Sequence, residues 1–391
     1  MKHCWQKEAN ISGFIICSSK MKAIIQKMDN WQRIWNDDGS NNRYSPTKTL
    51  LYAFSLLYRL IIHLRNWLYD HNIFREVKLP CPVISVGNIT VGGTGKTPCV
   101  IWLARMLREQ GFKPAVLSRG YGSINSSPVN IVSDGNHILA SSAGAGDEPY
   151  LMARSLQGIP IITGPQRILT GKTAINSFGA DVLICDDAFQ HRQIFRDINL
   201  VLLDSEKPLG NGQMLPRGSL REPITALSRA SAFILTRTNE SAKTNVAIAK
   251  LAAAGNTPVF KSAHRPVAAI KGDYSRQLSL ADLQGKKVCA FAGIAQPESF
   301  KKTLLSLGVQ VISWDIFPDH HRYCLQELKN VRHNMSKNNA DIIMTTEKDG
   351  MRLQEFTEFL NEIYLLRIEL EIVPDENSLK NFLLGKLGKT G

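Results

Sequence analysis

A short apolar run, a glycine-rich turn and a second apolar run follow one another between residues 82 and 107. The first run, Pro82–Gly87, has the composition of a buried parallel strand, and Val100–Leu107 has the spacing of a helix. Between them lies the sequence TVGGTGKT, at residues 90–97. This order of strand, glycine-rich turn and helix favours an α/β fold built on a parallel sheet.

The turn predicts a binding site for the phosphates of a nucleotide. Glycines let the backbone curl so that successive N–H groups face phosphate oxygens, and the following helix adds the partial positive charge of its N-terminus. We expect Lys96 to bridge the β- and γ-phosphates of ATP and the Thr97 hydroxyl to hold Mg²⁺. Thr90 stands where the usual motif has glycine. The residues expected to bind the nucleotide are Gly92, Gly93, Thr94, Gly95, Lys96 and Thr97.

Strand and helix patterns alternate as far as residue 235, which predicts a P-loop NTPase-like parallel sheet with helices on both faces. The further strands expected in this core are 114–117, 160–163, 181–185, 198–204 and 232–235. A smaller second α/β domain is expected after it, with strands at 287–292, 309–314 and 342–345 and a helix at 299–307.

The same patterns divide the chain into five segments. We expect a weakly ordered extension at 1–44, an amphipathic helix at 45–76, the P-loop core at 77–240, a connection at 241–265 and the second domain at 266–391. The connection is expected to hold an Ala-rich helix at 246–254 and a short strand at 258–261.

Two acidic pairs follow or precede predicted elements of the core. Asp186 and Asp187 end the strand 181–185, where a P-loop fold needs a second Mg²⁺ contact, although a turn or a helix cap would also explain them. Asp147 and Glu148 open a predicted helix, where acidic residues are ordinary caps. The same position could also place a carboxylate beside the acceptor of a phosphoryl group.

The segment from Leu50 to Tyr69 is dense in aliphatic and aromatic residues, and Ser45-Pro46 is a typical helix start. Its polar residues form one narrow helical stripe, which consists of Ser55, Arg59, His63, Asn66 and Asp70. Such a helix is either buried in the core or lies in a membrane interface. The first 80 residues carry 12 Lys and Arg against 6 Asp and Glu, which favours the membrane interface.

The charge and the cysteines limit the class of protein. There are 47 Lys and Arg against 34 Asp and Glu, so the chain is attracted to an anionic partner such as a nucleic acid, an acidic membrane or a phosphorylated ligand. Seven cysteines occur without a CxxC or Cys/His ligand spacing, which argues against a disulfide framework and a zinc site. No run of about 18 uninterrupted apolar residues predicts a spanning helix, and we expect a cytoplasmic protein.

Over roughly residues 50–370 the chain resembles the tetraacyldisaccharide 4'-kinase family, the lipid A 4'-kinases of Gram-negative bacteria. The shared motifs are VGN at 86–88 with GGTGKT at 92–97, SRGYG at 118–122, GDEP at 146–149, DDAFQH at 186–191, GNG at 210–212, REP at 221–223, PDH at 318–320 and TEKD at 346–349. Eight motifs in this order are specific, whereas one alone would not be. The threonine at position 90 is a trait of that family.

The resemblance implies transfer of the ATP γ-phosphate to the 4'-hydroxyl of a tetraacyldisaccharide 1-phosphate, with Mg²⁺, at the cytoplasmic face of the inner membrane. It implies that Asp147 takes the hydroxyl proton with the help of His320, although the adjacent His321 leaves the choice of histidine open on spacing alone. It further implies that Thr97, Asp186, Asp187 and Glu222 manage Mg²⁺ and phosphate charge. The side chains expected to contact substrate are Arg119, Arg167 and Asn88.

Three other functions compete with this one. A P-loop ATPase or GTPase switch is the first, but guanine readers need a lysine two residues before their aspartate, and Lys348 directly precedes Asp349. A nucleic-acid-binding protein is the second, and no known RNA- or DNA-binding signature supports it. A soluble small-molecule kinase is the third, and the apolar helix argues against it. No obligate protein partner is expected.

Overall fold

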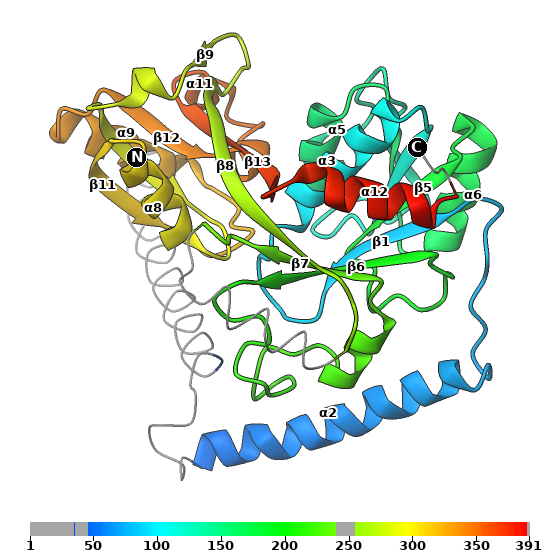
Figure 1. Ribbon diagram of the computed structural model, residues 1–391. Helices are drawn as coiled ribbons and strands as arrows, with labels where there is room; N and C mark the ends of the chain where they lie inside the picture. The colour runs from blue at the N-terminus through cyan, green and yellow to red at the C-terminus, as the bar shows by residue number, and fades with distance from the viewer. Residues whose placement is uncertain (1–34, 36–45, 240–254, 389–391) are drawn as a thin grey trace, which may run out of the picture.

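The computed structural model describes residue 35 and residues 46–239 and 255–388 (Figure 1). In this part of the chain thirteen strands form one sheet, in the order β11-β10-β12-β13-β8-β7-β6-β1-β5-β2-β4-β3, with β9 paired to β8. The sheet is mostly parallel and helices flank it, as the sequence predicts. Apart from Trp35, the expected extension 1–44 lies outside the described residues, as does the Ala-rich helix at 246–254.

The first seven strands are β1 (Val83–Asn88), β2 (Pro114–Ser118), β3 (Asn130–Ser133), β4 (Ile161–Thr163), β5 (Val182–Asp186), β6 (Ile198–Asp204) and β7 (Ala232–Thr236). The remaining strands are β8 (Val259–Lys271), β9 (Gln277–Leu278), β10 (Lys287–Ala292), β11 (Gln310–Ile316), β12 (Ile342–Thr346) and β13 (Tyr364–Val373).

The helices before β8 are α2 (Pro46–Asp70), α3 (Lys96–Glu109), α4 (Ser142–Ala145), α5 (Asp147–Ser155), α6 (Arg167–Phe178) and the 3₁₀ helix η1 (Ile224–Arg229). Those after it are η2 (Ala281–Leu283), α8 (Pro297–Ser306), α9 (Leu325–Lys337), α10 (Glu347–Arg352), α11 (Thr357–Leu360) and α12 (Glu376–Lys386).

Two long strands join two lobes of the molecule (Figure 1). The first lobe contains β1–β7 with α3–α6, and the second contains β9–β12 with α8–α11. Strands β8 and β13 run antiparallel between them, from Lys271 opposite Tyr364 to Lys261 opposite Val373. The sheet therefore crosses the expected limits of the two domains, and those limits stay a prediction.

The sequence prediction for this joining ribbon was incomplete. The strand expected at 258–261 is the start of the thirteen-residue β8, and no strand was expected for β13. Pro266 concealed the length of β8, because proline inside a strand removes a backbone donor. The structure accommodates Pro266 beside a register shift between Arg367 and Ile368 on β13.

The core of the first lobe places the glycine-rich loop at the centre of the sheet. Helix α3 packs Val100, Leu103 and Leu107 against one face of the sheet, where all three side chains are fully buried. Strand β1 pairs with β5 so that Val86 lies opposite Asp186. The two polar segments that follow these strands therefore start side by side at the same edge of the sheet.

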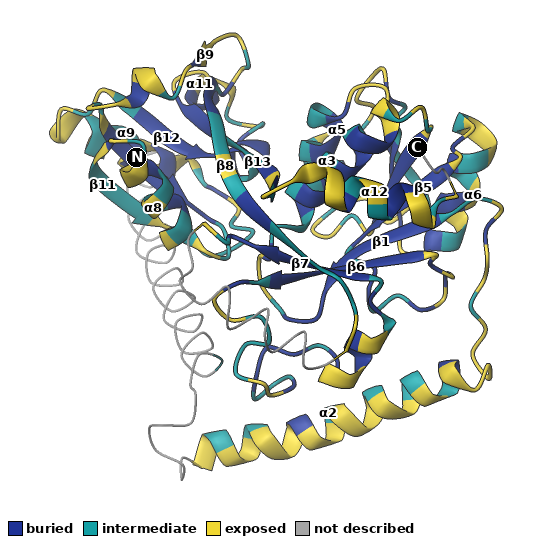
Figure 2. Ribbon diagram, in the orientation of Figure 1, coloured by how far each residue is buried: buried dark blue, intermediate teal, exposed yellow. Residues whose placement is uncertain are grey.

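Helix α2 lies along the underside of the first lobe and leaves most of its surface uncovered (Figure 2). The interpretation of α2 as a core helix is wrong, because only Ser55 and Tyr69 are buried. Its large exposed apolar side chains are Leu50, Tyr52, Phe54, Leu56, Leu57, Leu60, Ile61, Leu64 and Trp67. None of the helices within the described residues combines the length and the apolarity needed to cross a bilayer.

Candidate active site

The glycine-rich loop connects β1 to α3 and has the conformation that phosphate binding needs. Gly92 and Gly95 have φ angles of 122° and 80°, in the left-handed region that favours glycine. The backbone carbonyl of Gly93 accepts a hydrogen bond from the Arg237 guanidinium at 3.1 Å. Lys96 Nζ lies 3.6 Å from Asp187 Oδ1, so the lysine ammonium is held at the edge of the loop.

A cavity of about 1090 Å³ lies over this loop and is lined by residues of both lobes. The predicted site residues that line it are Gly92, Gly93, Thr94, Gly95, Lys96, Thr97, Arg119, Arg167, Asp186, Asp187 and His320. Three predicted residues are absent from the described residues that line it: Asp147, Asn88 and Glu222. The structure thus brings together most of the expected site, from segments that lie between Gly92 and His320 in the sequence.

Asp186 has the environment expected of a magnesium ligand. Its Oδ2 accepts a hydrogen bond from Ser118 Oγ at 3.0 Å, whereas its buried Oδ1 has no partner. Burial, together with the charges of Glu148 and Asp187, raises the pKa of Asp186 to about 7. A bound cation would satisfy the unpaired oxygen and favour the charged carboxylate.

The other acidic residues expected near Mg²⁺ are already paired. The Arg221 guanidinium donates to both oxygens of Asp187 at 3.0 Å. Burial would raise the pKa of Asp187, but the charges of Lys96 and Arg221 outweigh it and lower that pKa. Glu222 is fully buried between Arg65, at 3.4 Å, and Arg229. The structure therefore does not bring Glu222 to the expected metal site, because the charge of Glu222 is balanced by these arginines away from the cavity.

Mg²⁺ usually binds proteins through one or two carboxylates and completes its shell with phosphate oxygens and water. No group of three or more His, Cys, Asp or Glu side chains within the described part of the chain is arranged to hold a metal ion by itself. Asp186 and the Thr97 hydroxyl at the cavity fit the sparser arrangement that goes with a nucleotide.

The residues expected to contact substrate lie in three different settings. Arg119 is exposed to the cavity, where its guanidinium can meet an anion. Arg167 also lines the cavity but is largely buried, and it donates to the carbonyls of Gly164 at 2.6 Å and Asp186 at 3.3 Å. Asn88 is fully buried behind the loop, where its side-chain amide lies 3.5 Å from the Gly92 carbonyl. Asn88 thus supports the loop and does not line the cavity.

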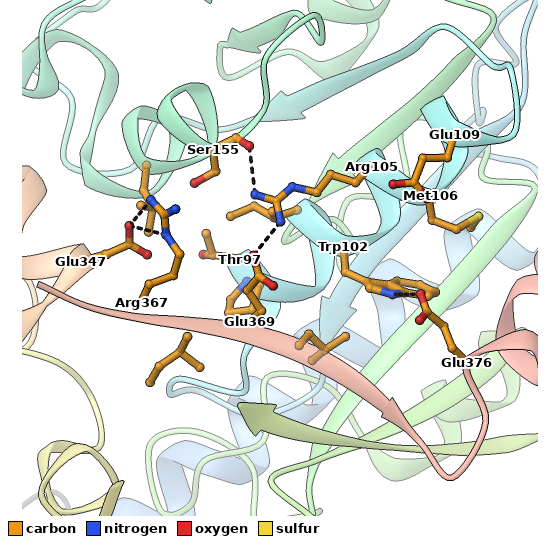
Figure 3. Close-up of a pocket in the computed structure, with 15 residues that line it drawn as sticks. Thr97, Trp102, Arg105, Met106, Glu109, Ser155, Glu347, Arg367, Glu369 and Glu376 are labelled. Carbon is orange, nitrogen blue, oxygen red and sulfur yellow. Dashed lines mark hydrogen bonds and ion pairs between the residues drawn. The ribbon is translucent and has the colours of Figure 1, made fainter. Parts of the chain in front are cut away.

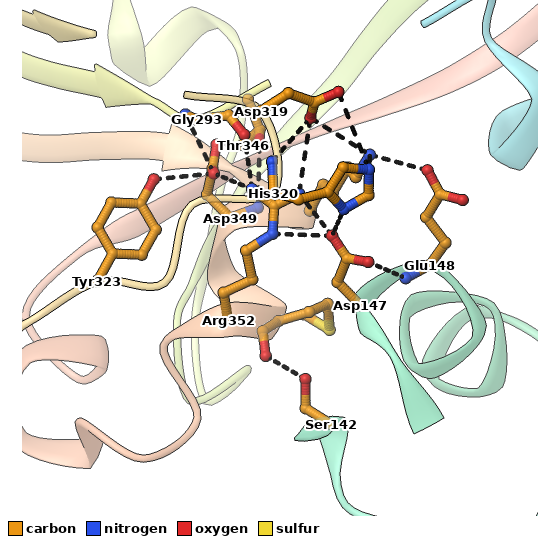
Figure 4. Close-up of polar contacts among 12 residues, drawn as sticks. Ser142, Asp147, Glu148, Gly293, Asp319, His320, Tyr323, Thr346, Asp349 and Arg352 are labelled. Carbon is orange, nitrogen blue, oxygen red and sulfur yellow. Dashed lines mark hydrogen bonds and ion pairs between the residues drawn. The ribbon is translucent and has the colours of Figure 1, made fainter. Parts of the chain in front are cut away.

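Asp147 and His320 meet across the two lobes (Figure 4). His320 Nδ1 lies 3.0 Å from Asp147 Oδ2, and Arg352 Nε donates to the same oxygen at 2.8 Å. Burial would raise the pKa of Asp147, but the bond from His320 and the charge of Arg352 together hold it well below its usual range. The imidazole lines the cavity, and the carboxylate lies behind it.

The geometry also distinguishes the two adjacent histidines. His321 Nε2 lies 3.0 Å from Glu327 Oε2, and the ring stacks on Phe317 with the ring centroids 5.0 Å apart. His321 therefore belongs to the packing of the second lobe, and His320 is the histidine that reaches Asp147.

The sequence prediction missed a lysine that the second lobe brings to the cavity. Lys348 Nζ donates to Glu148 Oε1 at 2.8 Å and lies 3.5 Å from His320 Nε2. Burial would lower the pKa of Lys348, but the charges of Glu148 and Asp319 outweigh it and raise that pKa. The presence of Lys348 in the TEKD motif was the sequence signal for this residue. The spacing of the motif alone could not show that it faces the first lobe.

A second, smaller cavity of about 160 Å³ lies between α3 and β13 (Figure 3). Four of its six charged side chains form ion pairs: Arg105 with Glu369 at 2.8 Å and Arg367 with Glu347 at 2.8 Å. Because these pairs satisfy one another, this cavity is better described as part of the junction of α3 with β13 than as a second reaction site.

Comparison with known proteins supports the resemblance seen in the motifs. The sequence profile of the family described as Tetraacyldisaccharide-1-P 4'-kinase matches residues 47–388. A tetraacyldisaccharide 4'-kinase of Syntrophus aciditrophicus is 50% identical over 355 residues, which cover 88% of this chain and 95% of that protein. One of Desulfatibacillum aliphaticivorans is 42% identical over 357 residues, which cover 89% and 95% of the two chains.

The fold agrees with a solved structure as well. The crystal structure of an "apo" form of LpxK from Aquifex aeolicus in complex with ATP superposes with a TM-score of 0.71 at 32% sequence identity. The match covers 87% of this chain and 99% of that one. With its glycine-rich loop, its two-lobed cavity and these relatives, the chain belongs to the tetraacyldisaccharide-1-P 4'-kinase family.

Proposed function

We propose that this chain transfers the γ-phosphate of ATP to the 4'-hydroxyl of a tetraacyldisaccharide 1-phosphate. One observation supports the proposal beyond family membership: His320, held from behind by Asp147 of the other lobe, lines the same cavity as Lys96 and the glycine-rich loop. A phosphate grip and a proton acceptor that share one cavity are what transfer to a hydroxyl requires.

The phosphate side of the reaction depends on positioning and charge. The loop N–H groups and the Lys96 ammonium bind the β- and γ-phosphates and hold the leaving oxygen. Thr97 and Asp186 are the residues that would hold Mg²⁺, which neutralises phosphate charge when bound. Arg119 and Lys348 add cations to the cavity wall, where they attract the anionic substrates.

The acceptor side depends on a base, because a sugar hydroxyl is a poor nucleophile. The Asp147–His320 pair takes the hydroxyl proton as the oxygen bonds to the γ-phosphorus and the bond to the β-phosphate oxygen breaks. ADP leaves, and the phosphate stays on the sugar. Asp147 fixes the ring through Nδ1 at 3.0 Å, and Arg352 fixes Asp147 in turn.

We further propose that the chain sits peripherally on the cytoplasmic face of the inner membrane of a Gram-negative bacterium. The exposed apolar side of α2 supports this location, since large apolar patches are seldom left in water. An acceptor with four acyl chains is itself a membrane component, so its kinase must work at that surface.

Incubation of the purified chain with γ-labelled ATP, Mg²⁺ and the lipid disaccharide 1-phosphate tests the function. We expect the label in a lipid-soluble bisphosphate that a 4'-phosphatase can release, and Asp147→Asn serves as the inactive control. Label that appears only as inorganic phosphate would instead support an ATPase switch. Label on a water-soluble sugar alone would support a soluble small-molecule kinase.

A further inference from the structure

The face of α2 that packs on the first lobe combines apolar contacts, such as that of Ile62, with polar side chains that bond to the first lobe. Ser55 Oγ donates to the Met214 carbonyl at 2.9 Å and accepts from the Arg217 N–H at 2.9 Å. Tyr58 and Arg65 follow on the same face and also bond to backbone carbonyls. A helix that served only as an anchor could pack through apolar contacts, so these directional bonds call for another explanation.

Tyr58 connects the helix to a cation of the cavity. Its hydroxyl donates to the Arg221 carbonyl at 2.9 Å, and Tyr58 itself lines the cavity. The side chain of the same arginine clamps both oxygens of Asp187, which lies 3.6 Å from Lys96 Nζ. The path from Tyr58 on α2 to Lys96 in the phosphate loop therefore runs through two residues, Arg221 and Asp187.

Arg65 makes a second, independent connection. Its guanidinium donates to the Gln190 carbonyl and lies 3.4 Å from Glu222 Oε1. The Gln190 amide in turn donates to the Asn88 carbonyl at 2.8 Å, at the end of β1 where the phosphate loop begins. One connection thus ends at Lys96 in the phosphate loop, and the other ends at the Asn88 carbonyl just before it. Both start from the same face of α2.

We propose that α2 is a working part of the phosphotransfer site, in which Tyr58 and Arg65 are positioning residues for the Arg221 and Gln190 segments. The inference rests on the proposed kinase function and adds to it a role for the helix other than attachment. Tyr58 holds the backbone from which Arg221 reaches Asp187, and Arg65 holds the segment that supports the start of the loop.

A pair of tyrosine variants tests the proposal on the full chain. Tyr58→Phe removes only the hydroxyl that holds the Arg221 carbonyl, and Tyr52→Phe removes the hydroxyl of an exposed tyrosine on the same helix. Loss of one such hydrogen bond corresponds to a fall in kcat of about three- to tenfold, with the Kd of ADP unchanged. We expect this fall for Tyr58→Phe and an unchanged kcat for Tyr52→Phe, with equal vesicle binding.

Variants of Arg65 allow a second test, in which kcat and Tm are compared to separate a positioning role from a purely structural one. Arg65→Met removes the charge and both bonds, whereas Arg65→Lys keeps the charge opposite Glu222 and should restore part of kcat at unchanged Tm. If Arg65→Met does not fold, the tyrosine pair alone decides.

Three outcomes would overturn the inference. The first is Tyr58→Phe with the same kcat as Tyr52→Phe, and the second is a fall in kcat that is matched by an equal loss of ADP affinity and a lower Tm. A wild-type chain that transfers no label to the lipid would overturn the kinase function itself, and the positioning role with it.

Discussion

Replacing three leucines of α2 with serine should release the chain from membranes without disturbing its fold. Leu57, Leu60 and Leu64 are 55%, 64% and 56% exposed. At 100° per residue they lie about 80–160° around the helix from Tyr58 and Arg65, outside the face that packs on the first lobe. Complete burial of a leucine contributes about 1.5–3 kcal/mol, so a side chain with half of its surface available contributes about 1 kcal/mol. The three substitutions together should weaken vesicle binding by about 3 kcal/mol, or roughly 100-fold.

Co-sedimentation with vesicles that contain anionic phospholipid measures this change as a partition coefficient. Leu139→Ser and Leu305→Ser are matched controls, because these leucines are 58% and 52% exposed but lie outside α2. The triple variant should keep its Tm and its activity on a detergent-dispersed acceptor. A triple variant that binds vesicles as tightly as wild type, or controls that lose as much binding, would refute the assignment of α2 to the membrane interface.

Three further predictions concern the cavity. Asp147→Asn should lower kcat by roughly 10²–10⁴ while ADP binding, measured by calorimetry, is retained; near-normal turnover would remove Asp147 from the proton transfer. His320→Gln should lower kcat strongly and His321→Gln only slightly, and the reverse order in the transfer assay would contradict the geometry. Burial, together with nearby carboxylates, raises the pKa of Asp186 to about 7. Between about pH 4 and pH 7 the ligand-free folded chain therefore keeps a proton on Asp186 that the unfolded chain has released, and the free energy of unfolding falls as pH rises through this range. Asp186→Asn should therefore raise Tm at pH 8 but not at pH 4, and equal Tm changes at both values would count against it.

Local patterns were enough to predict the phosphate loop and the elements beside it. The strand before Gly87, the loop and the start of α3 are adjacent in sequence, so their chemistry and their geometry are set by the same few residues. The strand that ends at Asp186 was equally clear, because β5 is apolar and fully buried along its length.

Contacts between distant residues could not be predicted from these patterns. Asp147 and His320 are 173 residues apart, and only the family resemblance paired them. The REP motif shows a different limit, because its two charged residues face different ways. Arg221 reaches Asp187 at the cavity, whereas Glu222 lies against Arg65 and Arg229 away from it. Spacing cannot tell which of two adjacent charged side chains faces a ligand.

The proposed proton acceptor is divided between the two lobes, and this division bears on the fate of bound ATP. The carboxylate belongs to the lobe that holds the nucleotide, and the imidazole belongs to the other. The two halves of the pair are joined by a single 3.0 Å contact, so a rotation of one lobe that lengthened it would leave the imidazole without the carboxylate that orients it. A water molecule beside ATP would then meet no oriented base, and breakdown of the nucleotide without transfer would depend on the angle between the lobes.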